Sequence, residues 1–377
     1  MEQRAHKERI IRRARRVIVK IGSSTLSGPD GMQRERVARL AHNFATLRAA
    51  QREIVVVTSG AIAAGMNRLG LKERPRTIPG KQAAAAVGQI ALMALYEEYC
   101  AAHQIRVAQI LLTHDDLAHR RRYLNAKHTL LALLEAGVLP IVNENDTVAV
   151  EEIQFGDNDN LSALVAVLIE ADLLVILSDV AGLYDQDPRR FPDATLIPLV
   201  EKFDEGLLSV AGSAGPLGRG GMASKIEAAR KATLSGIPTI IADGRRQDTL
   251  LSVFDPAVES GTLFLPVTDR LASRKHWIAY TLKPAGALVV DAGASAAIRA
   301  QGRSLLPRGV RAVQGVFEEG ECVTCVDAAG QTFARGLVNY SSAELERIKG
   351  IHTSQIEEVL GYKVSDEVIH RNDLALL

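Results

Sequence analysis

The sequence predicts an α/β protein with a mostly parallel β-sheet sandwiched by helices, followed by a small β-barrel-like domain. Three observations support this fold class. The chain has 377 residues, more than a single hydrophobic core usually supports, so two domains are expected. Residues 16–265 alternate short apolar runs with longer segments of helical period. From residue 284 onward, short strands are separated by glycine-containing turns.

Six short apolar runs mark the expected strands of the first domain. They are rich in β-branched residues and do not alternate with polar ones, as expected for strands that helices cover on both faces. The segments between most of them, such as residues 82–103, have the length and period of helices. This rhythm gives a mostly parallel sheet, because each helix returns the chain to the same starting edge. The runs are residues 16–22, 53–60, 107–113, 139–145, 173–179 and 239–244.

The change of pattern near residue 266 sets the expected domain boundaries. The second domain ends in a helix around residues 342–350. The first residues of the chain are rich in arginine and read as a solvated basic arm, with nucleic-acid contact as the less favoured alternative. The parts are a basic arm at 1–15, the α/β domain at 16–265, a linker at 266–283, the small β domain at 284–362 and a tail at 363–377.

Composition excludes several classes of protein. Lys and Arg total 45 against 44 Asp and Glu, so the whole chain has no charge that would attract a polyanionic partner. Three cysteines are too few for a disulfide framework and suggest a reducing cytoplasm. The longest apolar stretch, 161–177, is interrupted by Glu170 and Asp172, so no membrane-spanning helix is expected there.

Two strand ends carry residues suited to binding phosphate. The segment "VKIGSS" places Lys20 before Gly22 and Ser23, so that a fixed cation and backbone N–H groups can meet an anion. The segment "VTSGAIAAG" leads from a strand through Ser59 and Gly60 into an alanine-rich helix, whose free N–H groups attract anions. Ordinary tight turns without a ligand are the competing interpretation of both.

A third glycine-rich segment, "GPLGRGGMASK", covers residues 215–225 and runs into a helix beginning near Met222. Lys225 then lies on the first helical turn, where a loop can cover a phosphate with a cation in place. The spacing is not that of a Walker A loop, because no Gly-Lys-Ser/Thr follows at the required distance. Any nucleotide site here is therefore not of the P-loop type.

An acidic, amide-bearing cluster precedes the apolar segment that begins at Leu161. One or two of its members are explained as helix caps. The remainder suit an α-ammonium group better than a polyanion. An EF-hand calcium loop is excluded, because the spaced glutamate is absent. The cluster consists of Asp146, Asp157, Asn158 and Asp159.

Ser178 and Asp179 follow the fifth expected strand. Asp179 can hold lysines or Mg²⁺ near a phosphate, and a turn cap is the alternative.

Taken in order, "VKIGSS", "VTSGAIAAG", "IVNENDTVA", "GDNDNLSA", "LSDVAGLY" and "GRGGMASK" closely resemble the glutamate 5-kinases of the amino-acid kinase superfamily. The resemblance covers nearly the whole chain, and the C-terminal part resembles a PUA domain. It implies the amino-acid kinase fold and ATP-dependent phosphorylation of the γ-carboxylate of L-glutamate, the first step of proline biosynthesis. Ser178 and Arg219 stand where these kinases often have Thr, and Arg219 is expected to alter the contacts to ATP.

The resemblance also implies roles for individual residues. Lys20 and Lys225 neutralise the transferring phosphoryl group, and Asp179 positions them. The acceptor site comprises Ser59, Asp146, Asp157, Asn158 and Asp159. The ATP site comprises Lys20, Gly22, Ser23, Gly60, Ser178, Asp179, Arg219, Gly220, Gly221, Met222, Ala223, Ser224 and Lys225.

The resemblance further implies ATP and Mg²⁺ as cofactors, with no residue directly assigned to the metal. Proline is implied as a feedback inhibitor, and a homo-oligomer, dimer or tetramer, as the assembly.

Two alternatives stay open at this point. The acceptor can be another small acid, such as carbamate, aspartate or a nucleoside monophosphate. The PUA-like part can bind RNA, which is not favoured because residues 281–377 contain ten Lys and Arg against twelve Asp and Glu. A local basic face around Arg303, Arg308 and Arg311 keeps this possibility open.

Overall fold

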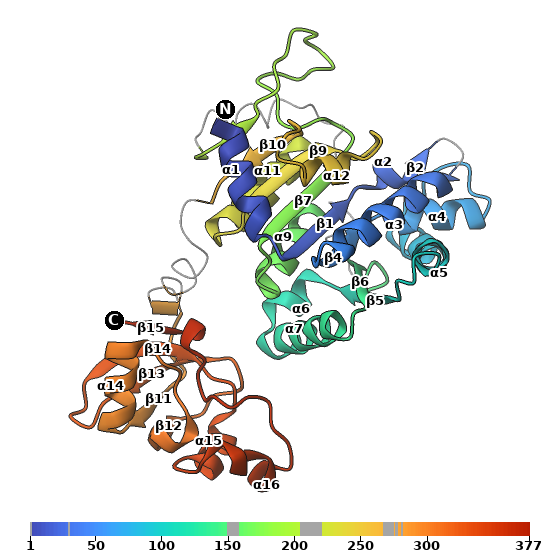
Figure 1. The fold of residues 1–377 in the computed structure, drawn as a ribbon. Coiled ribbons are helices and arrows are strands. Elements are labelled where there is room, and N and C mark those ends of the chain that lie inside the picture. The colour runs from blue at the N-terminus through green and yellow to red at the C-terminus, as the bar shows by residue number, and fades with distance from the viewer. Residues whose placement is uncertain are drawn as a thin grey trace. The chain divides into compact units, whose positions relative to one another are not determined.

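The computed structural model describes residues 2–28, 31–148, 158–203, 221–266, 275, 278–279 and 282–377. The chain divides into two compact units (Figure 1). The first contains residues 1–118 and 126–267, and the second contains residues 119–125 and 268–377.

An eight-stranded sheet forms the centre of the first unit, in the order β5-β6-β4-β1-β7-β9-β10-β8. Neighbouring strands are parallel except for β10, which runs antiparallel to β9. This confirms the predicted α/β class with a mostly parallel sheet. The strands are β1 (Arg16–Ile21), β4 (Glu53–Thr58), β5 (Val107–Leu112), β6 (Leu139–Glu144), β7 (Leu173–Ser178), β8 (Leu199–Val200), β9 (Thr239–Asp243) and β10 (Thr262–Phe264).

Helices follow most of these strands, and a short hairpin of β2 (Ser27–Gly28) and β3 (Gly31–Met32) lies after the first. The helices described are α1 (Glu2–Arg13), α2 (Ser23–Leu26), α3 (Arg34–Ala49), α4 (Ala61–Arg68), α5 (Ile78–Ala101), α6 (His114–Ala118), α7 (Arg120–Glu135), α9 (Asn158–Leu168), α11 (Met222–Leu234) and α12 (Thr249–Val253).

The two faces of strand β1 have different neighbours, because alternate residues of a strand point to opposite sides of the sheet. Val17, Val19 and Ile21 belong to the hydrophobic core that α3 and α5 also build. Lys20 therefore points to the other face, where α9 and α11 pack on each other and on the sheet. This alternation places a lysine at the strand end beneath two helices.

Helices α4 and α5 cross at two glycines. A Cβ atom on Gly65 would lie 1.7 Å from the carbonyl oxygen of Ala84, and one on Gly88 would lie 1.7 Å from that of Ala61. Only hydrogen fits at these positions, so the backbones approach closely. The crossing fixes the start of α4, which Gly60 caps with a φ of 109°.

The second unit is built on a five-stranded sheet with the order β12-β11-β13-β14-β15. β11 and β13 are parallel, and the other neighbours are antiparallel. The strands are β11 (Gly286–Val290), β12 (Val310–Gly315), β13 (Cys322–Val326), β14 (Thr332–Leu337) and β15 (Leu374–Leu376), and the helices are α14 (Ala292–Gln301), α15 (Ser342–Ile348) and α16 (Ile356–Leu360).

The C-terminal residues are part of this unit and not a separate tail. β15 pairs with β14, and Leu374 and Ala375 are buried. Ile278 and Ala279, from the expected linker, pack with Ala375 in one apolar cluster. The boundaries predicted at 283 and 362 therefore fall inside a single packed body, because both flanking segments bury apolar side chains against its sheet.

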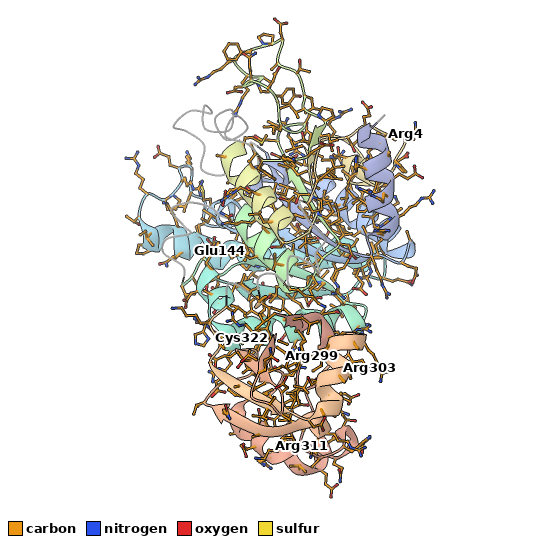
Figure 2. All side chains as sticks on the ribbon, turned by 90° about the vertical axis from the view of Figure 1, so that its left-hand side faces the viewer. Arg4, Glu144, Arg299, Arg303, Arg311 and Cys322 are labelled. Atoms are coloured by element: carbon orange, nitrogen blue, oxygen red, sulfur yellow. The ribbon has the colours of Figure 1, made fainter. Side chains whose placement is uncertain are left out.

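The predicted basic face of the second unit carries carboxylates as well. Of the three predicted arginines, Arg311 forms an ion pair of 3.1 Å with Asp291, and nearby Arg299, which was not part of the predicted face, forms one of 3.0 Å with Asp327. Figure 2 shows Arg299, Arg303 and Arg311 among the side chains of this unit. Paired guanidinium groups attract phosphate less strongly, because a carboxylate already balances their charge.

No helix in the described parts of the chain has both the length and the apolar character needed to cross a membrane.

The N-terminal segment differs from the predicted solvated arm. Residues 2–13 form helix α1, in which Ile11 and Lys7 are buried. Lys7 is only 2% exposed. The burial of its charge is tolerated because the ammonium group has four hydrogen-bond acceptors. These are the carbonyl oxygens of Ser252 (3.0 Å), Asp255 (2.9 Å) and Val258 (2.6 Å) and the hydroxyl of Ser260 (3.0 Å).

Replacement of Lys7 by methionine should destabilise the first unit. Burial lowers the pKa of Lys7 to about 8, against the opposing charges of Asp255 and Glu259, so the side chain is still an ammonium at pH 7. Lys7→Met removes the ammonium donor from all four acceptors, and although the carbonyl oxygens of Ser252 and Asp255 still accept from backbone N–H groups, we expect a loss of about 1–3 kcal/mol in the free energy of unfolding. Urea denaturation measures it, with the exposed Arg13→Met on the same helix as control. Equal stability of the two variants would contradict a structural role for this lysine.

Candidate active site

A cavity of about 490 Å³ lies at the carboxyl ends of β1, β4, β6 and β7. The helices α2, α4, α9 and α11 begin at its wall. In parallel sheets ligands bind at this edge, because the polar loops and helix N-termini meet there. The order of the strands places β1 between β4 and β7, so the end of β1 lies between the strand ends that line the two sides of the cavity.

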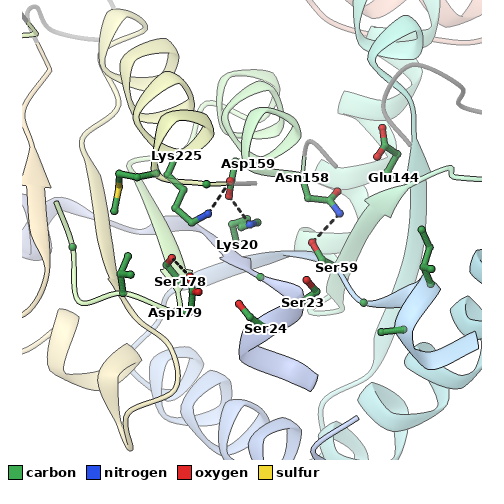
Figure 3. A pocket seen from close by; sticks show the side chains of 18 of the residues that line it. Lys20, Ser23, Ser24, Ser59, Glu144, Asn158, Asp159, Ser178, Asp179 and Lys225 are labelled. Carbon is green, nitrogen blue, oxygen red and sulfur yellow. Dashed lines mark hydrogen bonds and ion pairs between the residues drawn. The ribbon is translucent and has the colours of Figure 1, made fainter. Parts of the chain in front are cut away.

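Two lysines from distant parts of the sequence meet on one carboxylate (Figure 3). Lys20 Nζ lies 2.5 Å from Asp159 Oδ1, and Lys225 Nζ lies 3.2 Å from Asp159 Oδ2. The Ser224 hydroxyl donates to the same Oδ2 at 2.7 Å. All three charged side chains are almost fully buried, at 5%, 5% and 1% exposure for Lys20, Lys225 and Asp159.

The protonation of Asp159 follows from these neighbours. Burial by itself would raise the pKa of its carboxyl group, but the charges of Lys20 and Lys225 and the hydrogen bonds from Lys20 and Ser224 lower the pKa to about 2. Asp159 is therefore ionised at neutral pH, which holds two ammonium groups close together despite their mutual repulsion.

The carboxylate between the lysines is not the one predicted for this task. The sequence predicts Asp179 as the residue that positions the lysines, and Asp159 as a residue of the acceptor site. In the structure both lysines contact Asp159, while the described hydrogen bond of Asp179 comes from Ser178 Oγ at 3.2 Å. Asp179 still lines the cavity, close to the end of β7.

Backbone N–H groups face the cavity beside the lysines. Gly22, Gly60 and Gly221 stand at the starts of α2, α4 and α11, and no side chain caps these three helix ends. Their first N–H groups are therefore available to an anion, and the helix dipole favours negative charge there. All three glycines line the cavity, together with Ser23 and Met222.

The opposite part of the cavity is lined by amides and carboxylates. Asn158 Nδ2 donates to Ser59 Oγ at 2.9 Å and to Asn143 Oδ1 at 3.1 Å. Asn143 Nδ2 in turn donates to Gln89 Oε1 at 2.8 Å. Asn158 Oδ1 is buried and has no hydrogen-bond partner among the described residues, which leaves one acceptor for a ligand.

Asp146 also lines this part of the cavity. Burial raises the pKa of its carboxyl group to about 6, although the positive charge of Arg74 opposes the shift. Burial deprives this carboxylate of hydration, which raises its pKa. A cationic group of a ligand stabilises the ionised form in place of the lost water, so the site favours a cation.

Comparison with known proteins places the first unit in a family. Residues 15–243 match the model of the amino acid kinase family, and residues 286–360 match that of the PUA domain. The chain belongs to the amino acid kinase family. It is 51% identical over 370 residues to a glutamate 5-kinase of Pelobacter propionicus, which covers 98% of this chain and 99% of the relative.

Two further relatives support the same assignment. A glutamate 5-kinase of Meiothermus ruber is 53% identical over 363 residues, covering 96% of each chain. One from Citrifermentans bemidjiense is 51% identical over 373 residues, covering 98% of this chain and all of the relative. The predicted membership of the amino acid kinase family, with a C-terminal PUA domain, is confirmed.

Most of the predicted site residues of this amino acid kinase line one cavity. The exceptions are Ala223 and Ser224, which lie on the first turn of α11 behind it, with Ser224 bound to Asp159. Asp157, Arg219 and Gly220 lie outside the described residues.

Three side chains that line the amide end, Arg74, Asn143 and Glu144, and also Gln89, which accepts a hydrogen bond from Asn143, were given no role in binding from the sequence. Asn143 and Glu144 end the buried strand β6, and this position was a usable signal. Gln89 lies within an alanine-rich helix, and Arg74 lies in a loop of ordinary composition, so no sequence pattern marks either.

The acid dependence of stability tests which carboxylate holds the lysines. The folded-state pKa of Asp159, about 2, lies below its unfolded value of about 3.9, so its stabilisation is present above about pH 4 and lost as the pH falls toward 2. Asp159→Asn should lower the free energy of unfolding at pH 7 by about 2–3 kcal/mol, with the difference shrinking below pH 4.

Denaturation with urea at several pH values measures this difference, and Asp179→Asn is the matched control. A larger loss for Asp179→Asn than for Asp159→Asn would return the positioning role to Asp179.

Proposed function

We propose that this chain transfers the γ-phosphoryl group of ATP to the γ-carboxylate of L-glutamate, giving γ-glutamyl phosphate for proline biosynthesis. One observation carries the proposal: two buried ammonium groups, Lys20 and Lys225, meet at a cavity whose other end is lined by amides and carboxylates. The first end suits a polyphosphate, and the second suits the ammonium of an amino acid. Relatives at about half identity carry the same activity in their names.

ATP would lie over the glycine-rich helix starts. N–H groups at Ser23 and Gly60 would bind phosphate oxygens, whereas the Gly22 N–H donates to the carbonyl oxygen of Leu177 at 3.2 Å, so Gly22 would contribute close approach of the backbone. Residues 221–225 would contact the nucleotide from the α11 side. Lys20 and Lys225 balance the charge that builds on the transferring phosphoryl group. Asp159 keeps both ammonium groups in place before ATP arrives, so little reorganisation is needed during transfer.

The chemistry asks little covalent work of the protein. A γ-carboxylate is ionised at neutral pH, so its oxygen attacks the γ-phosphorus without a general base. The new O–P bond forms as the bond to the bridging oxygen breaks, and ADP leaves. Positioning and charge neutralisation therefore supply the catalysis.

Mg²⁺ is proposed as the metal that accompanies ATP. This ion keeps several waters and usually needs only one or two carboxylates besides the phosphate oxygens. Asp179 supplies a carboxylate on the cavity wall. We therefore propose that Asp179 would hold the metal and not the lysines. When bound, Mg²⁺ neutralises phosphate charge and orients the polyphosphate chain.

Ser59, Asp146 and Asn158 would bind glutamate. The ionised Asp146 attracts the α-ammonium group, and the free Oδ1 of Asn158 accepts a hydrogen bond from it. Proline carries the same ammonium and carboxylate groups, so we propose that it inhibits by occupying this end of the cavity. A homo-oligomer, dimer or tetramer, is proposed from the family resemblance, and RNA binding by the second unit is not favoured.

Phosphorylation of glutamate is tested by ADP release across a panel of acceptors. We expect glutamate to be the preferred acceptor over aspartate, carbamate and nucleoside monophosphates. Lys225→Met should lower kcat with glutamate by about 10²–10³, because one charge facing the phosphoryl group is lost. Lys231→Met on the same helix, which pairs with Asn160 and Glu227, is the control and should keep kcat within about twofold. A different preferred acceptor would reject glutamate, and full activity of Lys225→Met would reject the phosphoryl-transfer geometry.

The pH dependence of acceptor binding should report on Asp146. With ATP saturating, kcat/KM for glutamate should fall as the pH drops below about 6, because protonated Asp146 no longer attracts the ammonium group. The carboxyl groups of glutamate titrate at lower pH and do not produce this limb. Asp146→Asn should lower kcat/KM at pH 8 and flatten the limb. A variant that retains the wild-type limb would assign it to another group.

A further inference from the structure

Arg74 is a cation of the cavity that the proposed reaction does not use. It lies on the loop between α4 and α5 and lines the amide end of the cavity. Its side chain is exposed and makes no hydrogen bond or ion pair with the described part of the chain. An arginine in this position has its five donors available to a ligand.

The loop that carries Arg74 is held at both ends. Pro75 restricts the preceding Arg74 to an extended backbone. Pro75 also packs on the start of α5, where a Cβ on Gly80 would lie 3.1 Å from Pro75 Cβ. The Thr77 side chain accepts a hydrogen bond from Gly80 N at 3.3 Å and so caps α5. The backbone beside Arg74 is therefore fixed, which reduces the entropy lost when its side chain binds a ligand.

Arg74 and Asp146 form a pair of opposite charges without a direct contact. Both groups line the same cavity, and the charge of Arg74 lowers the pKa of Asp146 against the larger effect of burial. No ion pair joins them in the described structure. A ligand that carries one positive and one negative group can therefore bind between them.

The charges of glutamate identify that ligand. Its γ-carboxylate must face the transferring phosphoryl group near Lys20, and its ammonium group faces Asp146. The α-carboxylate then needs a cation. Among the described residues that line the cavity, both lysines are bound to Asp159, and Arg189 is 3.4 Å from Asp187. Arg74 is left for the α-carboxylate.

We propose that Arg74 binds the α-carboxylate of the amino-acid acceptor and is a specificity-determining residue. This inference rests on the proposed function. Arg74 and Asp146 together recognise the zwitterionic end of the acceptor, and the distance from that end to the phosphoryl group then selects the side-chain length. A planar guanidinium suits this task, because it can form two parallel hydrogen bonds to a carboxylate.

The proposal is tested by removing the α-carboxylate from the substrate and the guanidinium group from the protein. 4-Aminobutyrate is glutamate without its α-carboxylate, so it retains the carboxylate to be phosphorylated and the ammonium group. Arg74→Gln should raise KM for glutamate and its calorimetric Kd about 10- to 100-fold. The Ki of 4-aminobutyrate as a competitor of glutamate, and the KM for ATP, should change less than twofold.

Arg76→Gln is the matched control. Arg76 lies two residues away on the same loop, is 92% exposed in its side chain and is not part of the cavity lining. It should leave the KM for glutamate unchanged. Arg74→Lys should recover part of the affinity for glutamate, since it restores the charge without the planar geometry.

Three outcomes overturn the proposal. An unchanged glutamate Kd in Arg74→Gln would show that another group, such as the N–H groups at the start of α4, holds the α-carboxylate. Equal weakening of glutamate and 4-aminobutyrate would show a general structural effect of the loop. If the wild-type protein neither binds nor phosphorylates glutamate, the proposed function fails together with the role of Arg74. In the first two outcomes only the role of Arg74 fails, and the proposed function stands.

Discussion

The site depends on one interaction, the contact of Lys20 and Lys225 with the two oxygens of Asp159. Two ammonium groups buried side by side would repel each other and lose their hydration. A single ionised carboxylate between them removes most of this cost and fixes their position. It also requires that β1, α9 and α11 meet, since each contributes one of the three charges. The packing of these elements is therefore a condition of the charge pattern.

The cavity separates charge along its length. Lysines and uncapped helix starts give one end a positive potential, and carboxylates and amides give the other a negative one. An acceptor with an ammonium at one end and a carboxylate at the other is oriented by this field before any specific contact forms. Close helix crossing at Gly65 and Gly88 keeps the start of α4 at the wall between the two ends.

Local patterns were sufficient for the central sheet. Runs such as 16–22 and 173–179 carry apolar residues on both faces, as expected for parallel strands that helices cover on both sides. Local patterns were not sufficient at the two ends of the described chain. The charged residues 2–13 read as solvated, because no local pattern shows that Lys7 finds four acceptors near residues 252–260. Ala375, near the C-terminus, is buried for a similar reason: its strand partner lies about forty residues earlier, in β14.

By itself, the sequence determined the fold class, the family and the strand ends at which chemistry is concentrated, because periodicity and glycine-rich turns are properties of neighbouring residues. The tertiary structure decided which carboxylate serves which partner. Asp159 lies on the first turn of α9, and Asp179 follows the end of β7. No local sequence pattern shows which of the two carboxylates contacts the lysines. Only the crossing of α9 and α11 over β1 brings Asp159 between two lysines, because electrostatic contacts depend on distances between segments that lie about 140 and 65 residues apart.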